Sequence, residues 1–90
     1  MQYLFKGSQS QERLDWLFAM CKIKSDAIKA AASDHLVKGI SKTHAALLNN
    51  VPAPNLTRAL KTLNTYAELV EKIKAHDAQH SKFYALRAGL

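Results

Sequence analysis

The chain has 90 residues, of which 48% are hydrophobic and 22% are charged, and its formal net charge at pH 7 is +6. This length provides one core and is too short for a second one, so a single small domain is expected. The charge favours anionic partners, nucleic acid first and acidic protein or membrane surfaces second. A single cysteine excludes an internal disulfide and fits a reducing compartment.

No part of the sequence predicts export or a membrane anchor. The apolar start at Met1 is interrupted by Lys6, which is too early for a signal peptide, and no apolar run approaches the length of a membrane span. A cytoplasmic protein is therefore expected. Ala, Leu and Lys are abundant and β-branched residues are few, which favours an all-α fold, a small bundle of four to five helices.

Serines in suitable positions predict where the first helices begin. Residues 1–9 are expected to form an N-terminal arm, and Ser8 and Gln11 have the spacing of a capping box. A second helix is expected to begin after Ser25 and to end at Gly39, which tolerates the left-handed conformation that stops a helix. The apolar faces of these helices carry Leu14, Leu17, Phe18 and Cys21, and then Ile28, Ala31, Ala32, His35 and Leu36.

A short third helix is expected after Ser41, with Ala45 and Leu48 packing inward. It should stop at Asn50, because asparagine tolerates the left-handed conformation better than other non-glycine residues. Val51 then follows as an apolar plug.

The fourth helix is expected to begin behind two prolines, with Pro54 at its first position, and to reach about Lys74. Leu56, Leu63 and Val70 recur every seven residues, which is compatible either with a short coiled-coil seam or with packing inside the monomer. Residues 77–90 are expected to form a tail or a last short helix.

The third and fourth predicted helices together give a helix-turn-helix pattern. Ala46 provides the small residue where two helices approach, Asn50 stands in the turn, and Leu56 fixes the second helix to the core. Residues 10–76 are thus expected to be a DNA-binding domain. Spacing alone leaves a helical bundle without DNA-binding activity as an equal alternative.

Charge distribution favours the DNA-binding alternative. The chain has no acidic residue between Asp34 and Glu68, whereas the same window holds four basic residues, Lys38, Lys42, Arg58 and Lys61. Ordinary protein surfaces mix charges of both signs. A surface free of carboxylates suits phosphate binding, because each neutralised phosphate releases condensed counterions.

Helical periodicity then predicts the residues that contact DNA. Arg58 is the best candidate for reading a base edge or a narrow minor groove. Thr57 suits a phosphate or a thymine methyl group, and the lysines suit the phosphate backbone. Because Ala53 offers no side-chain cap, the amides near Asn55 are expected to be free for a phosphate. The complete predicted set is Lys38, Lys42, Thr43, Ala53, Asn55, Thr57, Arg58 and Lys61.

No catalytic or cofactor motif is present in the sequence. His76 and His80 have a spacing compatible with one helix face, but no cysteine or third histidine lies near them, so no metal site is expected. The carboxylates of the first predicted helix have no nucleophile or base beside them. We therefore expect neither an enzyme nor a cofactor.

From about Lys6 to Ile73 the sequence resembles the PapB family of adhesin (fimbrial) biosynthesis transcription regulators of enteric bacteria. The most specific block is Asp34–Lys42, DHLVKGISK. The other matching features are Gly7-Ser8, Ile23–Asp26, Ala46, Val51 and Ala59–Leu63. The sequence departs from the family pattern at Pro52–Leu56, where bases would be read, and in having Asn50 in place of the turn glycine.

The resemblance implies a helix-turn-helix protein that controls a fimbrial operon and binds AT-rich duplex DNA as a dimer or higher homo-oligomer. It also implies a bacterial protein associated with the nucleoid when bound, with Ser41–Asn49 as the supporting helix and about Ala53–Leu63 as the recognition helix. Two alternatives stay open at this stage. One is a plasmid- or phage-type helix-turn-helix repressor, and the other is a basic helical adaptor that binds an acidic protein.

Overall fold

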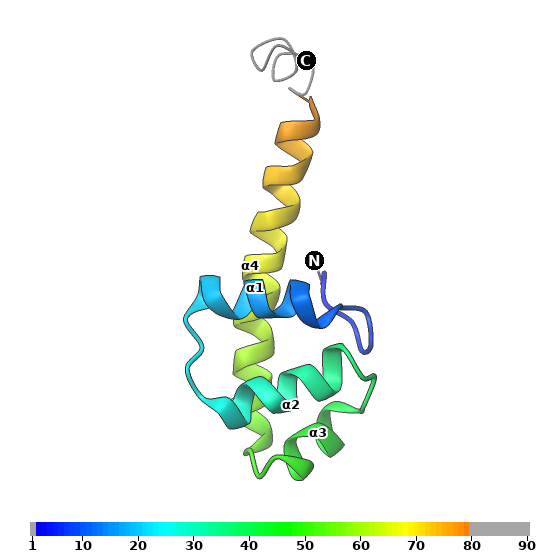
Figure 1. The fold of residues 1–90 in the computed structure, drawn as a ribbon, viewed down its shortest axis with the longest axis vertical. Helices are drawn as coiled ribbons and strands as arrows, with labels where there is room; N and C mark the ends of the chain where they lie inside the picture. Colours follow the sequence, from blue (N-terminus) through cyan, green and yellow to red (C-terminus); the bar gives the residue numbers. More distant parts are fainter. Residues whose placement is uncertain (1, 80–90) are drawn as a thin grey trace.

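The computed structural model describes residues 2–79, and this part of the chain folds into four helices without a β-strand (Figure 1). They are α1 (Gln11–Cys21), α2 (Asp26–Leu36), α3 (Lys42–Leu48) and α4 (Ala53–Gln79). The long helix α4 is crossed by α1, and α2 and α3 pack against its N-terminal part (Figure 1). The prediction of an all-α bundle is confirmed.

Serine side chains cap the first three helices. Ser10, Ser25 and Ser41 each accept a hydrogen bond from the backbone N–H three residues further on, at 3.1–3.3 Å. The caps expected at Ser25 and Ser41 are confirmed. The capping box expected to begin at Ser8 is wrong, because the Ser8 hydroxyl instead accepts from the Phe5 N–H at 3.0 Å and closes the turn before α1.

One apolar core lies between the four helices. Its largest fully buried side chains are Leu14, Leu36, Leu56 and Leu63. Small side chains let the helices approach closely, and the buried ones are Ala31, Ala32, Ala45, Ala46 and Ala67. Because Leu56 and Leu63 are completely buried within the monomer, the seven-residue repeat in α4 serves this core.

The outward side of α3 is unexpectedly apolar. Leu48, which the sequence predicted to pack inward, is 66% exposed, and its neighbour Leu47 is 70% exposed. In this seven-residue helix the buried face is supplied by Ala45 and Ala46. Val51, three residues after the end of α3, is buried in the apolar core. The prediction for Leu48 is therefore wrong.

Helix α4 extends beyond the core. It was expected to end near Lys74 but continues to Gln79, and every residue from 72 to 79 is exposed. Ion pairs between Glu68 and Lys72 and between Glu71 and Lys74, both at 3.5 Å, support this projecting end. The remainder of the expected C-terminal tail, residues 80–90, lies outside the described residues. No helix within residues 2–79 has the length and hydropathy needed to cross a membrane.

The segment before α1 is fixed to the helices. Leu4 is buried in the core, and the Asn64 Oδ1 atom on α4 accepts from the backbone N–H groups of Tyr3, at 2.6 Å, and Leu4, at 3.1 Å. Gly7 has a φ of 69°, and a Cβ atom there would lie 3.3 Å from the Cα of Gly39. This close backbone contact joins the N-terminal segment to the connection between α2 and α3.

Candidate nucleic-acid interface

The turn between α3 and α4 is closed by two backbone hydrogen bonds. The Asn50 N–H donates to the Leu47 carbonyl at 3.2 Å, and the Val51 N–H donates to the Ala46 carbonyl at 2.9 Å. Asn50 is left-handed, with a φ of 53°, as the sequence predicted. This is a Schellman motif with asparagine in the place usual for glycine. It fixes where α4 leaves α3 and completes the helix-turn-helix.

The end of α3 is also attached to α2 by a side-chain hydrogen bond. The Asn49 amide donates to Asp34 Oδ2 at 2.9 Å and to the Ala45 carbonyl at 2.8 Å. The hydrogen bond from Asn49, assisted by Lys38, whose Nζ lies 3.3 Å from the other Asp34 oxygen, holds the pKa of Asp34 below its ordinary value. Lys38 therefore already has a carboxylate partner, unlike the other basic residues of the predicted interface.

The first amides of α4 are not free. The N–H groups of Asn55 and Leu56 both donate to the Pro52 carbonyl, at 2.9 and 3.2 Å. The expected phosphate contact at these amides thus loses its basis. Helix α4 begins at Ala53, so Pro54 occupies its second position rather than the predicted first.

Three basic side chains at this end of the molecule are exposed and carry uncompensated charge. Lys42, Arg58 and Lys61 make no ion pair with any carboxylate in residues 2–79. The Arg58 Nη2 atom donates to Asn55 Oδ1 at 2.8 Å, which orients the guanidinium along α4. Thr43 and Ala53 are exposed nearby in the sequence, at the starts of α3 and α4.

The first turns of the four helices also differ in whether they carry an acidic residue. Helices α1 and α2 carry an acidic residue in the first turn, Glu12 and Asp26, which complements the positive end of the helix dipole. Helices α3 and α4 carry none. The two helices of the helix-turn-helix therefore leave the positive ends of their dipoles without a local carboxylate.

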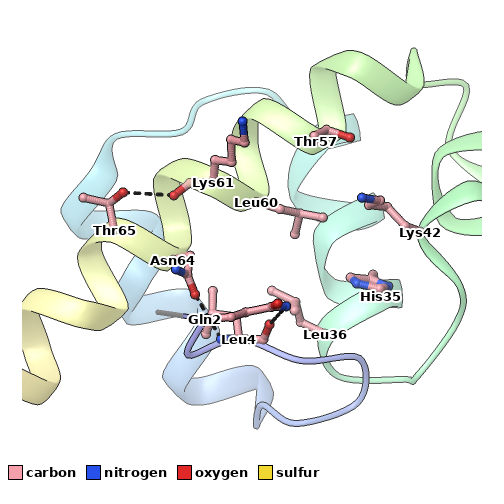
Figure 2. A pocket seen from close by; sticks show the side chains of 10 residues that line it. All are labelled: Gln2, Leu4, His35, Leu36, Lys42, Thr57, Leu60, Lys61, Asn64 and Thr65. Atoms are coloured by element: carbon pink, nitrogen blue, oxygen red, sulfur yellow. Dashed lines mark hydrogen bonds between the residues drawn. The ribbon is translucent and has the colours of Figure 1, made fainter.

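Three of the predicted residues meet in one hollow. Lys42, Thr57 and Lys61 line an open depression of about 660 Å³ (Figure 2). Arg58 and Asn55 do not line it. The other lining residues were not predicted, namely Gln2, Leu4, His35, Leu36, Leu60, Asn64 and Thr65. Asn64 and Thr65 lie three and four residues after Lys61, so helical spacing could have identified them, whereas the contribution of the N-terminal segment depends on tertiary folding.

Other reactive groups in the described part of the chain do not form a site. Within residues 2–79, no three His, Cys, Asp or Glu side chains come close enough to hold a metal ion. His80, the second member of the spaced histidine pair, lies outside this range. Cys21 is a half-buried free thiol whose Sγ lies 3.8 Å from the Phe18 carbonyl oxygen, on the core side of α1.

A solved structure with a similar fold supports the helix-turn-helix described above. No protein-family model matches the sequence, and no match was found among curated proteins. Among solved structures, the chain is similar to the crystal structure of E. coli FocB, with a TM-score of 0.78 and 25% sequence identity over 83% of this chain and 85% of that chain. FocB is a fimbrial regulator of the PapB family. The resemblance inferred from the sequence is thereby confirmed, and the chain has the fold of a PapB-family fimbrial regulator.

Proposed function

We propose that this chain is a DNA-binding transcription regulator of a fimbrial or adhesin operon, with residues 10–76 as its DNA-binding domain. The observation that carries the proposal is the end of the molecule formed by α3 and the first turns of α4. There Lys42, Arg58 and Lys61 are exposed without a carboxylate partner in residues 2–79. The similarity to FocB supports the same function.

Each residue of the interface has a distinct role in this proposal. Arg58, oriented by Asn55, reads a base edge or a narrow minor groove. Lys42 and Lys61 bind backbone phosphates, and Thr57 lines the same hollow. Lys38 makes a weaker phosphate contact because Asp34 already neutralises part of its charge. Thr43, Ala53 and Asn55 lie where the starts of α3 and α4 meet the duplex.

The proposal includes a homo-oligomer. One small domain offers few phosphate contacts, and a second copy on an adjacent site raises the effective concentration. Leu69 and Ile73 are exposed large apolar residues one turn apart on α4, and we assign them to contact with the second copy. Sedimentation velocity of the wild type and Ile73→Glu tests this contact. Equal sedimentation coefficients at all concentrations would reject it.

Fluorescence anisotropy with an AT-rich duplex and a mixed-sequence duplex, over a salt series, tests DNA binding. The comparison is between the wild type and Arg58→Ala/Lys61→Ala. Loss of the Lys61 phosphate contact should lower the slope of log K against log[salt] by about 1, and loss of Arg58 should remove the preference for one duplex. Lys72→Ala/Lys74→Ala is the matched control, because it removes the same charge from the projecting end of α4.

The anisotropy results distinguish a DNA-binding regulator from an adaptor that binds an acidic protein. Steep salt dependence and a duplex preference, both reduced only in Arg58→Ala/Lys61→Ala, support the regulator. Equal losses in both double variants would mean that overall charge, rather than this surface, attracts DNA. If the wild type binds no duplex at low salt, the basic surface serves an acidic protein partner instead, as in the adaptor alternative.

A further inference from the structure

The hollow between the N-terminal segment and the helices combines an apolar floor with a basic edge. Leu4, Leu36 and Leu60 contribute apolar side chains, and Lys42 and Lys61 contribute the charges (Figure 2). Figure 2 shows the Lys42 side chain extending from α3 towards α4. Lys61 lies on α4, one turn after Thr57. No acidic residue lines the hollow. An anion that enters it meets two cations and no repulsive carboxylate.

The N-terminal segment is a fixed wall of this hollow. Asn64, which lines it, accepts the backbone N–H groups of Tyr3 and Leu4 through Oδ1. Gln2 also lines the hollow, and its side-chain amide donates to the Leu4 carbonyl at 2.7 Å. These bonds hold the segment in one position beside α4. The hollow is therefore preformed, and a ligand does not have to order this wall on binding.

We propose that this hollow holds one phosphodiester unit of a DNA strand, so that the N-terminal segment and Asn64 belong to the DNA interface together with the helix-turn-helix. Lys42 and Lys61 bind the phosphate from two helices, and Thr57 offers a hydroxyl group, whereas the Thr65 hydroxyl already donates to the Lys61 carbonyl at 3.1 Å. Asn64 acts as a positioning residue through the backbone of the N-terminal segment. This inference rests on the proposed DNA-binding function and adds a specific place for one phosphate.

The chemistry of the hollow favours a phosphodiester over a free inorganic anion. A free phosphate or sulfate ion is hydrated on all sides and gains nothing from leucine side chains. A phosphate within a DNA strand is flanked by deoxyribose groups, whose C–H edges can cover Leu4 and Leu60. The volume of about 660 Å³ exceeds that of a lone phosphate and leaves room for parts of both sugars.

Substitutions that add a negative charge to the hollow test the proposal, and those chosen should change the fold little. Asn64→Asp keeps an oxygen that accepts from Tyr3 and Leu4 but adds a negative charge. Thr65→Glu adds a carboxylate at an exposed position of α4 and does not depend on the N-terminal segment. Gln79→Glu, at the far end of the same helix, is the control with the same change in net charge. Circular dichroism melts confirm folding of each variant.

Binding is measured with the AT-rich duplex and with a set of duplexes that each carry one uncharged methylphosphonate. We expect Asn64→Asp and Thr65→Glu to bind the unmodified duplex roughly tenfold more weakly at low salt, because a carboxylate then lies within several ångströms of the phosphate. Gln79→Glu should bind like the wild type. At one backbone position the methylphosphonate should weaken the wild type and leave Asn64→Asp and Thr65→Glu unaffected or improved.

Three results would overturn the inference, each in a different way. If folded Asn64→Asp and Thr65→Glu bind as tightly as Gln79→Glu while Arg58→Ala is weakened, DNA binding stands but the hollow does not hold a phosphate. If inorganic phosphate weakens wild-type binding more than chloride of equal ionic strength, and does not do so for Thr65→Glu, the hollow takes the free ion. If the wild type binds no duplex, the proposed function fails together with this inference.

Discussion

Removing the side chain of Asn49 should loosen the helix-turn-helix at its attachment to α2. The Asn49 amide donates one hydrogen bond to the Asp34 carboxylate, at 2.9 Å, and one to the Ala45 carbonyl, at 2.8 Å. In Asn49→Ala both donors are lost, and among residues 2–79 Asp34 keeps only Lys38 as a side-chain partner. The end of α3 is then held to α2 by apolar contacts without this polar link.

The structure sets the size of the effect. A hydrogen bond to a charged group contributes about 1.5–3 kcal/mol when it is well shielded. The Asp34 side chain is 16% exposed, so water can replace part of the lost bond, and we expect the lower part of this range. Asn49→Ala should therefore reduce the free energy of unfolding by about 1.5–2 kcal/mol at pH 7, or roughly 6–16 °C in Tm for a domain of this size.

The same bond makes the effect dependent on pH. The pKa of Asp34 is lowered in the folded protein, first by Asn49 and then by Lys38, from an ordinary value of 3.8. A lowered pKa means that the stabilisation is complete above the ordinary value and is lost as pH falls through the lower, folded-state value. The difference in stability between the wild type and Asn49→Ala should thus shrink between about pH 5 and pH 2.

Urea denaturation followed by circular dichroism, at pH 7, 5, 4, 3 and 2, measures these differences. A double-mutant cycle with Asp34→Ala separates the bond to Asp34 from the bond to the Ala45 carbonyl. The reasoning would be refuted if Asn49→Ala lost the same stability at every pH. It would also be refuted if the cycle at pH 7 gave no coupling between the two residues.

Three further stability predictions follow from the backbone and the core. Asn50→Val should cost about 1–2 kcal/mol because the residue is left-handed, whereas Asn50→Gly should change stability by less than about 0.5 kcal/mol; equal urea midpoints for the two would contradict the strain argument. Gly7→Ala should cost about 1–3 kcal/mol, because its φ is 69° and the new Cβ lies 3.3 Å from Gly39 Cα, and an unchanged Tm would disprove this close contact. Leu63→Ala, at 0% exposure, should lose about 2–5 kcal/mol in urea denaturation, and Leu69→Ala, at 49% exposure, about 0.5 kcal/mol or less; similar losses would contradict the assigned burial.

Local chemistry made much of the fold predictable. The serine caps at Ser25 and Ser41, the left-handed Asn50 and the buried Val51 each depend on a few neighbouring residues, and the structure has all four. Ser8 illustrates the limit of such signals. It has the correct spacing for a capping box, but the N-terminal segment folds back so that its hydroxyl accepts from Phe5 instead. Ser8 therefore belongs to a local turn with Phe5, and Ser10 caps α1 in its place.

The predicted site shows the same division between local and tertiary information. Helical spacing correctly placed Arg58 and Lys61 on the exposed side of α4. It could not show that Leu48 would be exposed, because that depends on how little of α3 the core can cover. It also could not show that Lys38 is paired with Asp34, or that residues 2–4 lie beside residue 64. Contacts of that kind depend on how the elements assemble.

The attachment of the N-terminal segment to Asn64 has a consequence for the order in which a growing chain can fold. Tyr3 and Leu4 are synthesised before all four helices, yet their hydrogen-bond acceptor lies 61 and 60 residues further along the chain. Helices α1, α2 and α3 are all synthesised before it. Until α4 emerges, the Leu4 side chain lacks the helix beside which it is buried. Completion of the wall beside Lys42 and Lys61 is therefore a late event in synthesis, so a chain interrupted before residue 64 would lack it.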